Sequence, residues 1–307
     1  MRIIQSDNPR PLNLFAVGPG GLVAAATSTS GVPANVEVWD ATTGARRFVY
    51  RAPQRECVSL LFDPAGRRLF VSEEESVSAI DVSTWAVTRG LLKPDFFAQV
   101  ALSPDGSRLL VTPAVDPRGT IACYWFDGGA VYGKFWAAGP DTAHYQLPAF
   151  RGDGAQFAVT AHDLTGDRAK PALQLRDATT GKVLVSIPTD AASPVRQLAF
   201  TADGAKLLVR TDGRTVQLFD ATTGAAAGEL VHPGRPYVTG VAVHPRGPVA
   251  CARTNGTVTF WDADTRAQLR TFDWKAGRLV SVAFSPDGAL AAAGTEDGKI
   301  VVWDVDV

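Results

Sequence analysis

Short apolar runs alternate with turn-forming residues along the chain, and the same order recurs seven times. In the clearest copy, which is the last, Val282–Phe284 is followed by Ser285–Gly288, and Ile300–Trp303 ends at Asp304. Within such runs apolar positions alternate with polar or small ones, as in Val216–Phe219. This period of two predicts strands with one buried face, whereas the helical period of 3.6 residues is missing from the chain.

The first turn of each copy is built around a glycine, often after Pro and Asp as in Ser103–Gly106. Proline presets φ at one corner, Asp can bond to the backbone just ahead of it, and Gly accepts the positive φ of a tight hairpin. The copies are spaced by roughly 40 to 50 residues, the period of propeller blades with four strands. The seven glycines are Gly21, Gly66, Gly106, Gly154, Gly204, Gly247 and Gly288.

A second turn recurs as Asp-Ala-Thr-Thr-Gly at Asp40–Gly44, Asp177–Gly181 and Asp220–Gly224. The Asp carboxylate can accept hydrogen bonds from nearby backbone N–H groups, and Gly can adopt the left-handed conformation. We therefore expect these aspartates to be structural.

Tandem units of this kind resemble the WD-repeat β-propeller family over essentially the whole chain. Its dipeptide stands here as Trp39-Asp40, Trp261-Asp262 and Trp303-Asp304, while blades two to five depart from it. The resemblance implies an all-β fold, a seven-bladed β-propeller with four-stranded antiparallel blades, in one domain over residues 1–307. The family's Gly-His dipeptide is absent, which implies blades held mainly by apolar packing and turns.

The last blade is one outer strand short, because the chain ends soon after Trp303. Met1–Gln5 precedes the first inner strand and has the length to supply the missing one. We therefore expect the N-terminal strand to close the ring, which would remove an exposed strand edge and make this ring the entire protein, acting as a monomer.

The formal charge of −1 and the pI near 6.4 give no reason to expect nucleic-acid or anionic-membrane binding. No stretch is long and apolar enough to span a bilayer, and residues 1–13 lack the apolar core of a signal peptide. The three cysteines, Cys57, Cys123 and Cys251, are odd in number and fall in separate repeats, so buried reduced thiols in a cytoplasmic protein are expected. Abundant Arg and Ala favour a bacterial source.

No constellation typical of catalysis, metal binding or cofactor binding emerges from the residues. Gly18–Gly21 lacks the Lys-Ser/Thr and the helix of a phosphate-binding loop, so it is interpreted as a hairpin turn. Glu73–Glu75 is interpreted as a solvated turn, with an ion or basic-peptide contact as the alternative. The best candidate metal ligands, which we expect not to form a site, are His162, Asp163 and Asp167, and Asp141 with His144.

Propeller topology places the connections between strands two and three, and those between blades, on one face. Three of these loops are long, and variable loops on a rigid scaffold usually carry binding. They are Thr27–Asn35, Pro113–Gly119 and His162–Lys170.

Aromatic and Arg side chains, the types that anchor protein interfaces, also fall on that face. We expect Tyr145 to pack between blades. The candidate partner-binding residues are Arg55, Phe96, His144, Arg196, Tyr237 and Arg278.

The sequence thus favours a non-catalytic platform that binds a protein or peptide partner around the central channel. The alternatives are a small-ligand or enzymatic propeller that uses the channel mouth as a pocket, and an assembly component whose only site is self-association.

Overall fold

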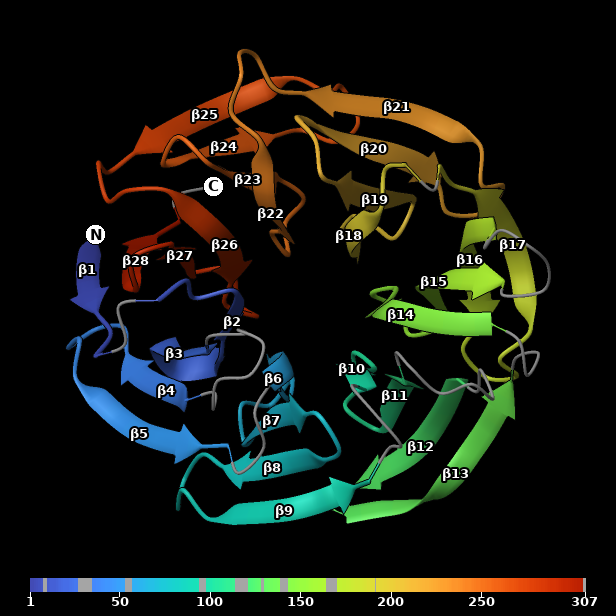
Figure 1. The fold of residues 1–307 in the computed structure, drawn as a ribbon, viewed down its shortest axis with the longest axis horizontal. Helices are drawn as coiled ribbons and strands as arrows, with labels where there is room; N and C mark the ends of the chain where they lie inside the picture. The colour runs from blue at the N-terminus through green and yellow to red at the C-terminus, as the bar shows by residue number, and fades with distance from the viewer. Residues whose placement is uncertain are drawn as a thin grey trace.

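The computed structural model describes residues 1–7, 10–26, 35–52, 57–93, 98–113, 121–127, 130–138, 143–163, 170–190 and 192–305. These residues form seven four-stranded sheets arranged radially around an axis (Figure 1). Within each sheet all neighbouring strands are antiparallel, and the first strand of each copy is innermost. The predicted all-β, seven-bladed β-propeller with four-stranded blades is confirmed.

The blades are numbered in the chain order of their inner strands, and the strands of each blade are given from the axis outward. Blade one contains β2 (Leu14–Val17), β3 (Leu22–Ala26), β4 (Asn35–Asp40) and β5 (Arg46–Arg51); blade two contains β6 (Cys57–Phe62), β7 (Arg68–Glu73), β8 (Val77–Asp81) and β9 (Val87–Leu92); blade three contains β10 (Ala98–Leu102), β11 (Arg108–Pro113), β12 (Ile121–Asp127) and β13 (Ala130–Ala138). Blade four contains β14 (Ala143–Phe150), β15 (Gln156–Asp163), β16 (Lys170–Asp177) and β17 (Val183–Pro188); blade five contains β18 (Val195–Phe200), β19 (Lys206–Thr211), β20 (Thr215–Asp220) and β21 (Ala226–Val231). Blade six contains β22 (Val238–Val243), β23 (Val249–Arg253), β24 (Thr257–Trp261) and β25 (Gln268–Asp273); blade seven contains β26 (Leu279–Phe284), β27 (Leu290–Thr295), β28 (Lys299–Asp304) and β1 (Arg2–Gln5).

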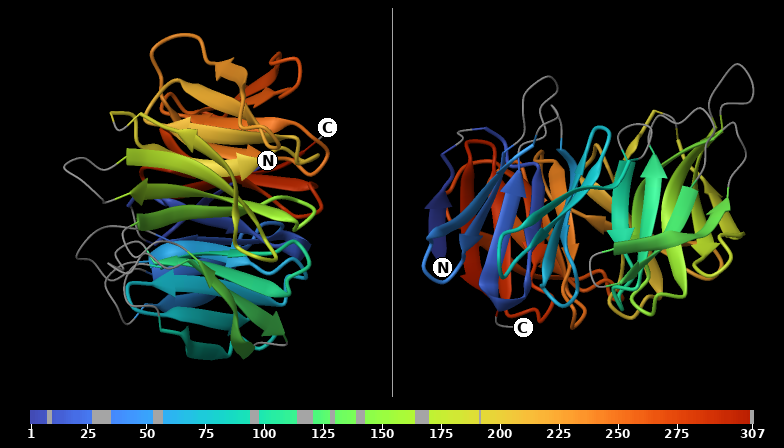
Figure 2. Two further views of the ribbon diagram at one scale, coloured as in Figure 1. Left: turned by 90° about the vertical axis from the view of Figure 1, so that its right-hand side faces the viewer. Right: turned by 90° about the horizontal axis from the view of Figure 1, so that it is seen from below.

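The N-terminal strand closes the ring, as the sequence predicted. Strand β1 pairs antiparallel with β28, with Arg2 opposite Val302 and Ile4 opposite Ile300. Beyond the strand, Ser6 N donates to Gly298 O at 2.9 Å. The outer strand of blade seven therefore comes from the opposite end of the chain, and both termini lie on the same face (Figure 2).

The core lies between successive blades and follows the alternation read from the sequence. Trp39, Trp261 and Trp303 of the repeated Trp-Asp dipeptides are all buried. Trp39 packs with Val23 and Val302, so it joins blade one to blade seven. Cys57, Cys123 and Cys251 are buried free thiols, as expected. No helix among the described residues is long and apolar enough to cross a membrane.

The second turns have the predicted chemistry. Asp40 Oδ1 accepts hydrogen bonds from the backbone N–H groups of Thr42 and Thr43, both at 2.9 Å. Equivalent contacts recur at Asp177 and Asp220. Because these bonds stabilise the charged form, they help to lower the pKa values of all three carboxyls. The aspartates of the repeated turn are therefore structural, as predicted.

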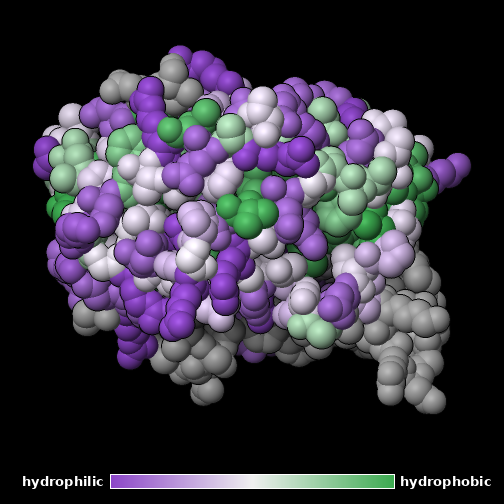
Figure 3. Space-filling model, turned by 90° about the horizontal axis from the view of Figure 1, so that it is seen from above, coloured by the Kyte–Doolittle hydropathy of each residue, from purple (hydrophilic) through white to green (hydrophobic). Residues whose placement is uncertain are grey.

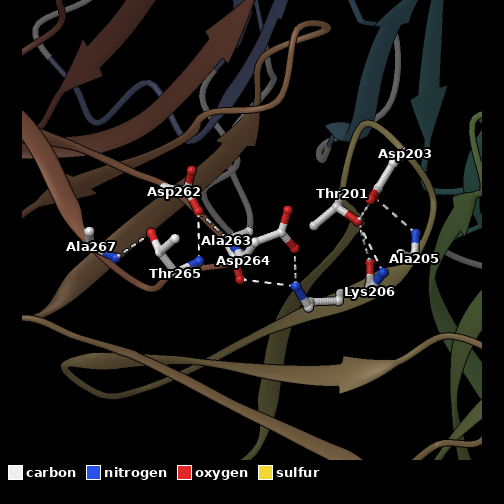
Figure 4. Close-up of polar contacts among 9 residues, drawn as sticks. All are labelled: Thr201, Asp203, Ala205, Lys206, Asp262, Ala263, Asp264, Thr265 and Ala267. Carbon is white, nitrogen blue, oxygen red and sulfur yellow. Dashed lines mark hydrogen bonds and ion pairs between the residues drawn. The ribbon is translucent and has the colours of Figure 1, made fainter.

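The repeated turns lie on the face opposite the connections between blades. Turns of neighbouring blades also contact one another there, as between blades five and six (Figure 4). Asp262 Oδ1 accepts from the backbone N–H groups of Asp264 and Thr265, at 2.9 and 2.7 Å. Lys206 Nζ, from β19, donates to Ala263 O at 3.2 Å and forms an ion pair with Asp264. The carboxylate of Asp262 is thus occupied inside its own turn, while Lys206 joins the two blades.

Hydrogen bonds from side chains to backbone connect adjacent inner strands. Gln197 of β18 reaches Val241 of β22 twice: its Nε2 donates to Val241 O at 2.6 Å, and its Oε1 accepts from Val241 N at 3.0 Å. Thr239 Oγ1 donates to Leu279 O at 2.9 Å, and Ser281 Oγ donates to Leu12 O at 3.0 Å. These bonds extend along the wall of the channel from blade five to the segment before β2.

The structure corrects the interpretation of Glu73–Glu75 as a solvated turn at Glu73 alone, since Glu74 is half-buried and Glu75 exposed in the bend after β7. Glu73 is fully buried and accepts hydrogen bonds from Tyr50 Oη and Ser76 Oγ, both at 2.8 Å. Tyr50 lies in β5 of the preceding blade, so the carboxylate joins blades one and two. Blades are therefore held by buried polar contacts as well as by apolar packing and turns.

Candidate partner-binding face

The connections between second and third strands and those between blades share one face, which we call the loop face. It points toward the viewer in Figure 1 and upward in the right-hand view of Figure 2. This placement follows from the consecutive antiparallel order of strands in each blade. The three long loops predicted to carry binding lie largely outside the described residues. The loop-face residues of blades five to seven are described.

Three predicted anchors lie at or just before the start of the inner strands of consecutive blades. Arg196 is the second residue of β18, while Tyr237 and Arg278 immediately precede β22 and β26. Arg55 and Phe96 lie outside the described residues. His144 lies in β14, where its backbone pairs with that of His162.

Both arginine anchors form ion pairs within their own blade. Arg196 Nε and Nη2 donate to Asp212 Oδ2 at 2.9 and 2.6 Å, and Arg278 Nε lies 3.3 Å from Glu296 Oε2. The Arg196 hydrogen bond is the main cause of the lowered pKa of Asp212. Tyr237 makes no comparable ion pair and is 52 % exposed. All three side chains are at least half exposed and can reach a partner.

A cavity of about 410 Å³ opens between the inner strands of five blades. Arg196, Gln197 and Arg210 line one part of it, and Thr239 and Ser281 another. Among the described residues that line this cavity none is His, Asp or Glu, and the only ionisable side chains are the two arginines. The described residues that line this cavity can therefore donate hydrogen bonds and attract negative charge, but they include no general base.

Arg210 is a channel residue that the sequence analysis missed. Burial lowers its pKa to about 10, and its Nη1 lies 3.4 Å from Val238 O. Strand pairing aligns Arg210 with Ala252 and Gly294, which are small residues in blades six and seven. A large cation at a position that is otherwise small is a signal that alignment of the repeats could have detected.

Two other aromatic residues, Tyr145 and Trp274, have structural roles. Tyr145 is buried, as predicted, and its hydroxyl accepts a hydrogen bond from Arg176 Nη2 at 3.1 Å. Trp274 stacks on Phe272 at 5.5 Å and lies 4.4 Å from the ring of Trp303. Their rings are thus used in packing rather than presented to a partner.

Two histidines that precede proline, His232 and His244, are buried. His244 Nδ1 accepts from Arg246 N at 3.1 Å, so its Nε2 carries the proton and donates to Gly288 O at 3.0 Å. His232 lies edge-on to Trp261 at 4.8 Å, and neither of its ring nitrogens has a hydrogen-bond partner. Neither histidine lines the channel cavity.

The candidate metal ligands fall partly outside the described residues, which include neither Asp141 nor Asp167. The part of the chain that the structure describes contains no group of three His, Cys, Asp or Glu residues able to hold a metal ion.

Comparison with known proteins locates one repeat unambiguously. Residues 266–304, which span β25 to β28, match the family model described as WD domain, G-beta repeat. This match, together with the relatives described next, supports assigning the chain to the WD40-repeat family. The WD repeat-containing protein SL1-17 of Schistosoma mansoni is 28% identical over 131 residues, which cover 43% of each chain.

Two further relatives match shorter stretches. The serine-threonine kinase receptor-associated protein of Gallus gallus is 27% identical over 38% of this chain and 33% of its own length. The target of rapamycin complex subunit wat1 of Schizosaccharomyces pombe is 28% identical over 30% of this chain and 29% of its own. The matched part of the chain thus covers less than half the length of each of these relatives. All three come from eukaryotes, so a bacterial source for the chain stays a prediction.

Proposed function

We propose that this propeller is a non-catalytic scaffold that binds a protein or peptide partner on the loop face around the channel mouth. The observation that carries the proposal is the row of exposed anchors Arg196, Tyr237 and Arg278 on consecutive blades. Arg and Tyr combine a large contact area with polar groups, and they are enriched among residues that dominate binding energy.

The composition of the channel supports this proposal over an enzyme or a small-ligand receptor. Acid–base catalysis requires ionisable groups of suitable pKa that converge on a substrate. Among the described residues that line the cavity between the inner strands, the ionisable ones are Arg196 and Arg210. The printed names of two relatives, a complex subunit and a receptor-associated protein, also describe proteins that associate with others.

The test is a variant in which Arg196, Tyr237 and Arg278 are all replaced by Ala. Full-length protein is immobilised, and proteins recovered from a native lysate are quantified by mass spectrometry. The expected result is loss of the partners recovered by the wild type. The melting temperature should fall by less than about 4 °C, because exposed ion pairs contribute only about 0–1 kcal/mol each.

The matched control removes two exposed arginines from the opposite face. Arg67 and Arg246 lie in the turns before β7 and β23. The double variant Arg67→Ala/Arg246→Ala should recover the same partners as the wild type. Undiminished recovery by the triple variant would place the site elsewhere. Equal losses in both variants would show that binding depends on net charge alone.

A further inference from the structure

Four arginines surround the connection between blades five and six, which covers residues 232–237. Two of them, Arg253 of β23 and Arg214 of the turn before β20, approach backbone carbonyls of this segment, Arg210 of β19 approaches the carbonyl of the next residue, and Arg235 belongs to the segment itself. The contacts are Arg253 Nη2 to Pro233 O at 2.6 Å, Arg214 Nη1 to Gly234 O at 3.5 Å, and Arg210 Nη1 to Val238 O at 3.4 Å. We call Arg210, Arg214, Arg235 and Arg253 the arginine patch.

No carboxylate among the described residues forms an ion pair with the arginine patch. The acidic side chains on this part of the loop face are already paired with other cations. The pairs are Arg196–Asp212, Lys275–Asp273, Arg278–Glu296 and Lys299–Asp297. Asp212 also attracts Arg210, but both hydrogen bonds that its Oδ2 accepts come from Arg196.

The patch has an accessible tier and a buried tier. Arg214 and Arg235 are exposed, as is Tyr237 at the end of the same connection. Arg253 is only 6 % exposed, and its Nε has no hydrogen-bond partner. A buried guanidinium without a counter-charge is costly, so a carboxylate arriving from outside would relieve an existing imbalance.

The remaining surface near the patch gives little support to an apolar partner. Figure 3 views the outer wall of the ring over blades five and six, where hydrophobic residues lie in small groups among hydrophilic ones. The exposed large hydrophobic residues of the two outer strands here are Val231 and Leu269. The outer wall beside the patch is therefore mixed in polarity in this view.

We propose that the partner segment bound by the loop face is acidic, and that its carboxylates bind Arg214 and Arg235 while its chain packs on Tyr237. This proposal rests on the scaffold function above and specifies the chemistry of the partner. A planar guanidinium binds carboxylates in a bidentate manner that a lysine cannot reproduce. Four cations on a chain whose net charge is −1 form a local patch, which is too small for the basic surface typical of a nucleic-acid-binding protein.

The experiment is selection of a random peptide display library on the immobilised full-length protein. We expect enrichment of peptides that are rich in Asp and Glu. Aromatic or aliphatic residues next to the acidic ones are compatible with this result. Selection of neutral or basic peptides whose binding is lost in the Arg196/Tyr237/Arg278 triple variant would overturn the acidic partner and leave the scaffold standing. Failure to select any peptide would count against both.

Selected acidic peptides are then compared by fluorescence anisotropy on defined variants. Arg214→Ala/Arg235→Ala should weaken binding by at least about tenfold, as the loss of two charge-assisted contacts implies. The opposite-face control Arg67→Ala/Arg246→Ala should bind as the wild type does. Replacing Glu by Gln in the peptide should cause a similar loss.

Two further probes identify the competing chemistries. A labelled single-stranded oligonucleotide that bound more tightly than the peptide, and lost binding in Arg214→Ala/Arg235→Ala, would assign the patch to nucleic acid and overturn the proposal. Inorganic phosphate that displaced the peptide at equal concentration would reduce the patch to a simple anion site. Equal peptide affinity in the wild type and this double variant would also overturn it.

Discussion

His232 makes the stability of the propeller depend on pH. Its side chain is 3 % exposed, its ring nitrogens lack partners, and the cation of Arg253 lies nearby. Burial, and then the charge of Arg253, lower the pKa of His232 from 6.5 to about 4. The neutral ring is therefore the folded form, while the unfolded chain takes up a proton below pH 6.5.

The sign and size of the effect follow from linkage. Between pH 6.5 and 4 the unfolded state binds more protons at this site, so this contribution to stability is present above pH 6.5 and is lost as the pH falls. With these two pKa values, acidification from about pH 7.5 to about pH 4.5 lowers the free energy of unfolding by about 2.5 kcal/mol through His232 alone.

The perturbation that isolates this term is His232→Leu, because leucine fills a similar space and does not titrate. Near pH 7.5 the variant should lie within about 1.5 kcal/mol of the wild type, since no hydrogen bond of the ring is lost. Near pH 4.5 it should gain about 2.5 kcal/mol relative to the wild type. Urea unfolding followed by tryptophan fluorescence at both pH values measures this double difference, in which the carboxyl groups common to both proteins cancel.

The reasoning fails if both proteins lose the same free energy on acidification. That outcome would mean that the ring of His232 is solvated or paired in the folded protein, and that its pKa is close to that of the unfolded chain.

Two other buried contacts make quantitative predictions for stability. Tyr50→Phe removes one of the two hydroxyl donors to the buried carboxylate of Glu73, so it should cost about 1–3 kcal/mol in thermal or urea unfolding, whereas Tyr237→Phe at the exposed anchor should cost less than about 0.5 kcal/mol. Equal effects of the two Tyr→Phe changes would contradict the Tyr50–Glu73 contact. Gln197→Met keeps the side-chain length but removes both hydrogen bonds to Val241, so the melting temperature should fall by the equivalent of about 1–2 kcal/mol; an unchanged value would show that channel water replaces these bonds fully.

The architecture could be predicted from sequence because its determinants are local and repeated. The turn at Asp40–Gly44 needs only its own residues, since Asp40 bonds to amides two and three positions ahead. Closure by Met1–Gln5 followed from a missing strand in the last blade. Each signal was present in the printed chain without knowledge of distant contacts.

Contacts between blades could not be predicted in the same way. Glu73 belongs to a run of three glutamates, which favours a solvated turn, and the residue that pairs with it, Tyr50, lies in the preceding blade. His232 follows the same logic, because its burial against Trp261 depends on how the connection folds over blade six. When the hydrogen-bond partner of a buried polar group lies in another blade, or is missing, the residues next to that group in the sequence do not indicate it.

For the candidate site, sequence reasoning proposed Arg196, Tyr237 and Arg278, which lie at or just before the start of consecutive inner strands, and it missed Arg210 and Arg253. The missed pair occupies the ends of β19 and β23, where other blades have Ala252, Gly294 or Thr295. An arginine inside an otherwise apolar strand is easily taken for a surface residue, and only the hydrogen bonds of the folded chain show that Arg210 reaches Val238 O and that Arg253 reaches Pro233 O. Whether these residues bind a partner stays a proposal.

The carboxylates of the repeated turns are satisfied locally, because those of Asp40, Asp177, Asp220 and Asp262 are occupied by amides of their own turns. By contrast, the buried Nε of Arg253, beside the connection between blades five and six, is left without a hydrogen-bond acceptor. A buried donor without an acceptor is destabilising, so a scaffold with no other role would gain stability from an apolar residue at that position. The unsatisfied donor of Arg253 is therefore a physical reason, independent of loop length, to look for an acidic partner there.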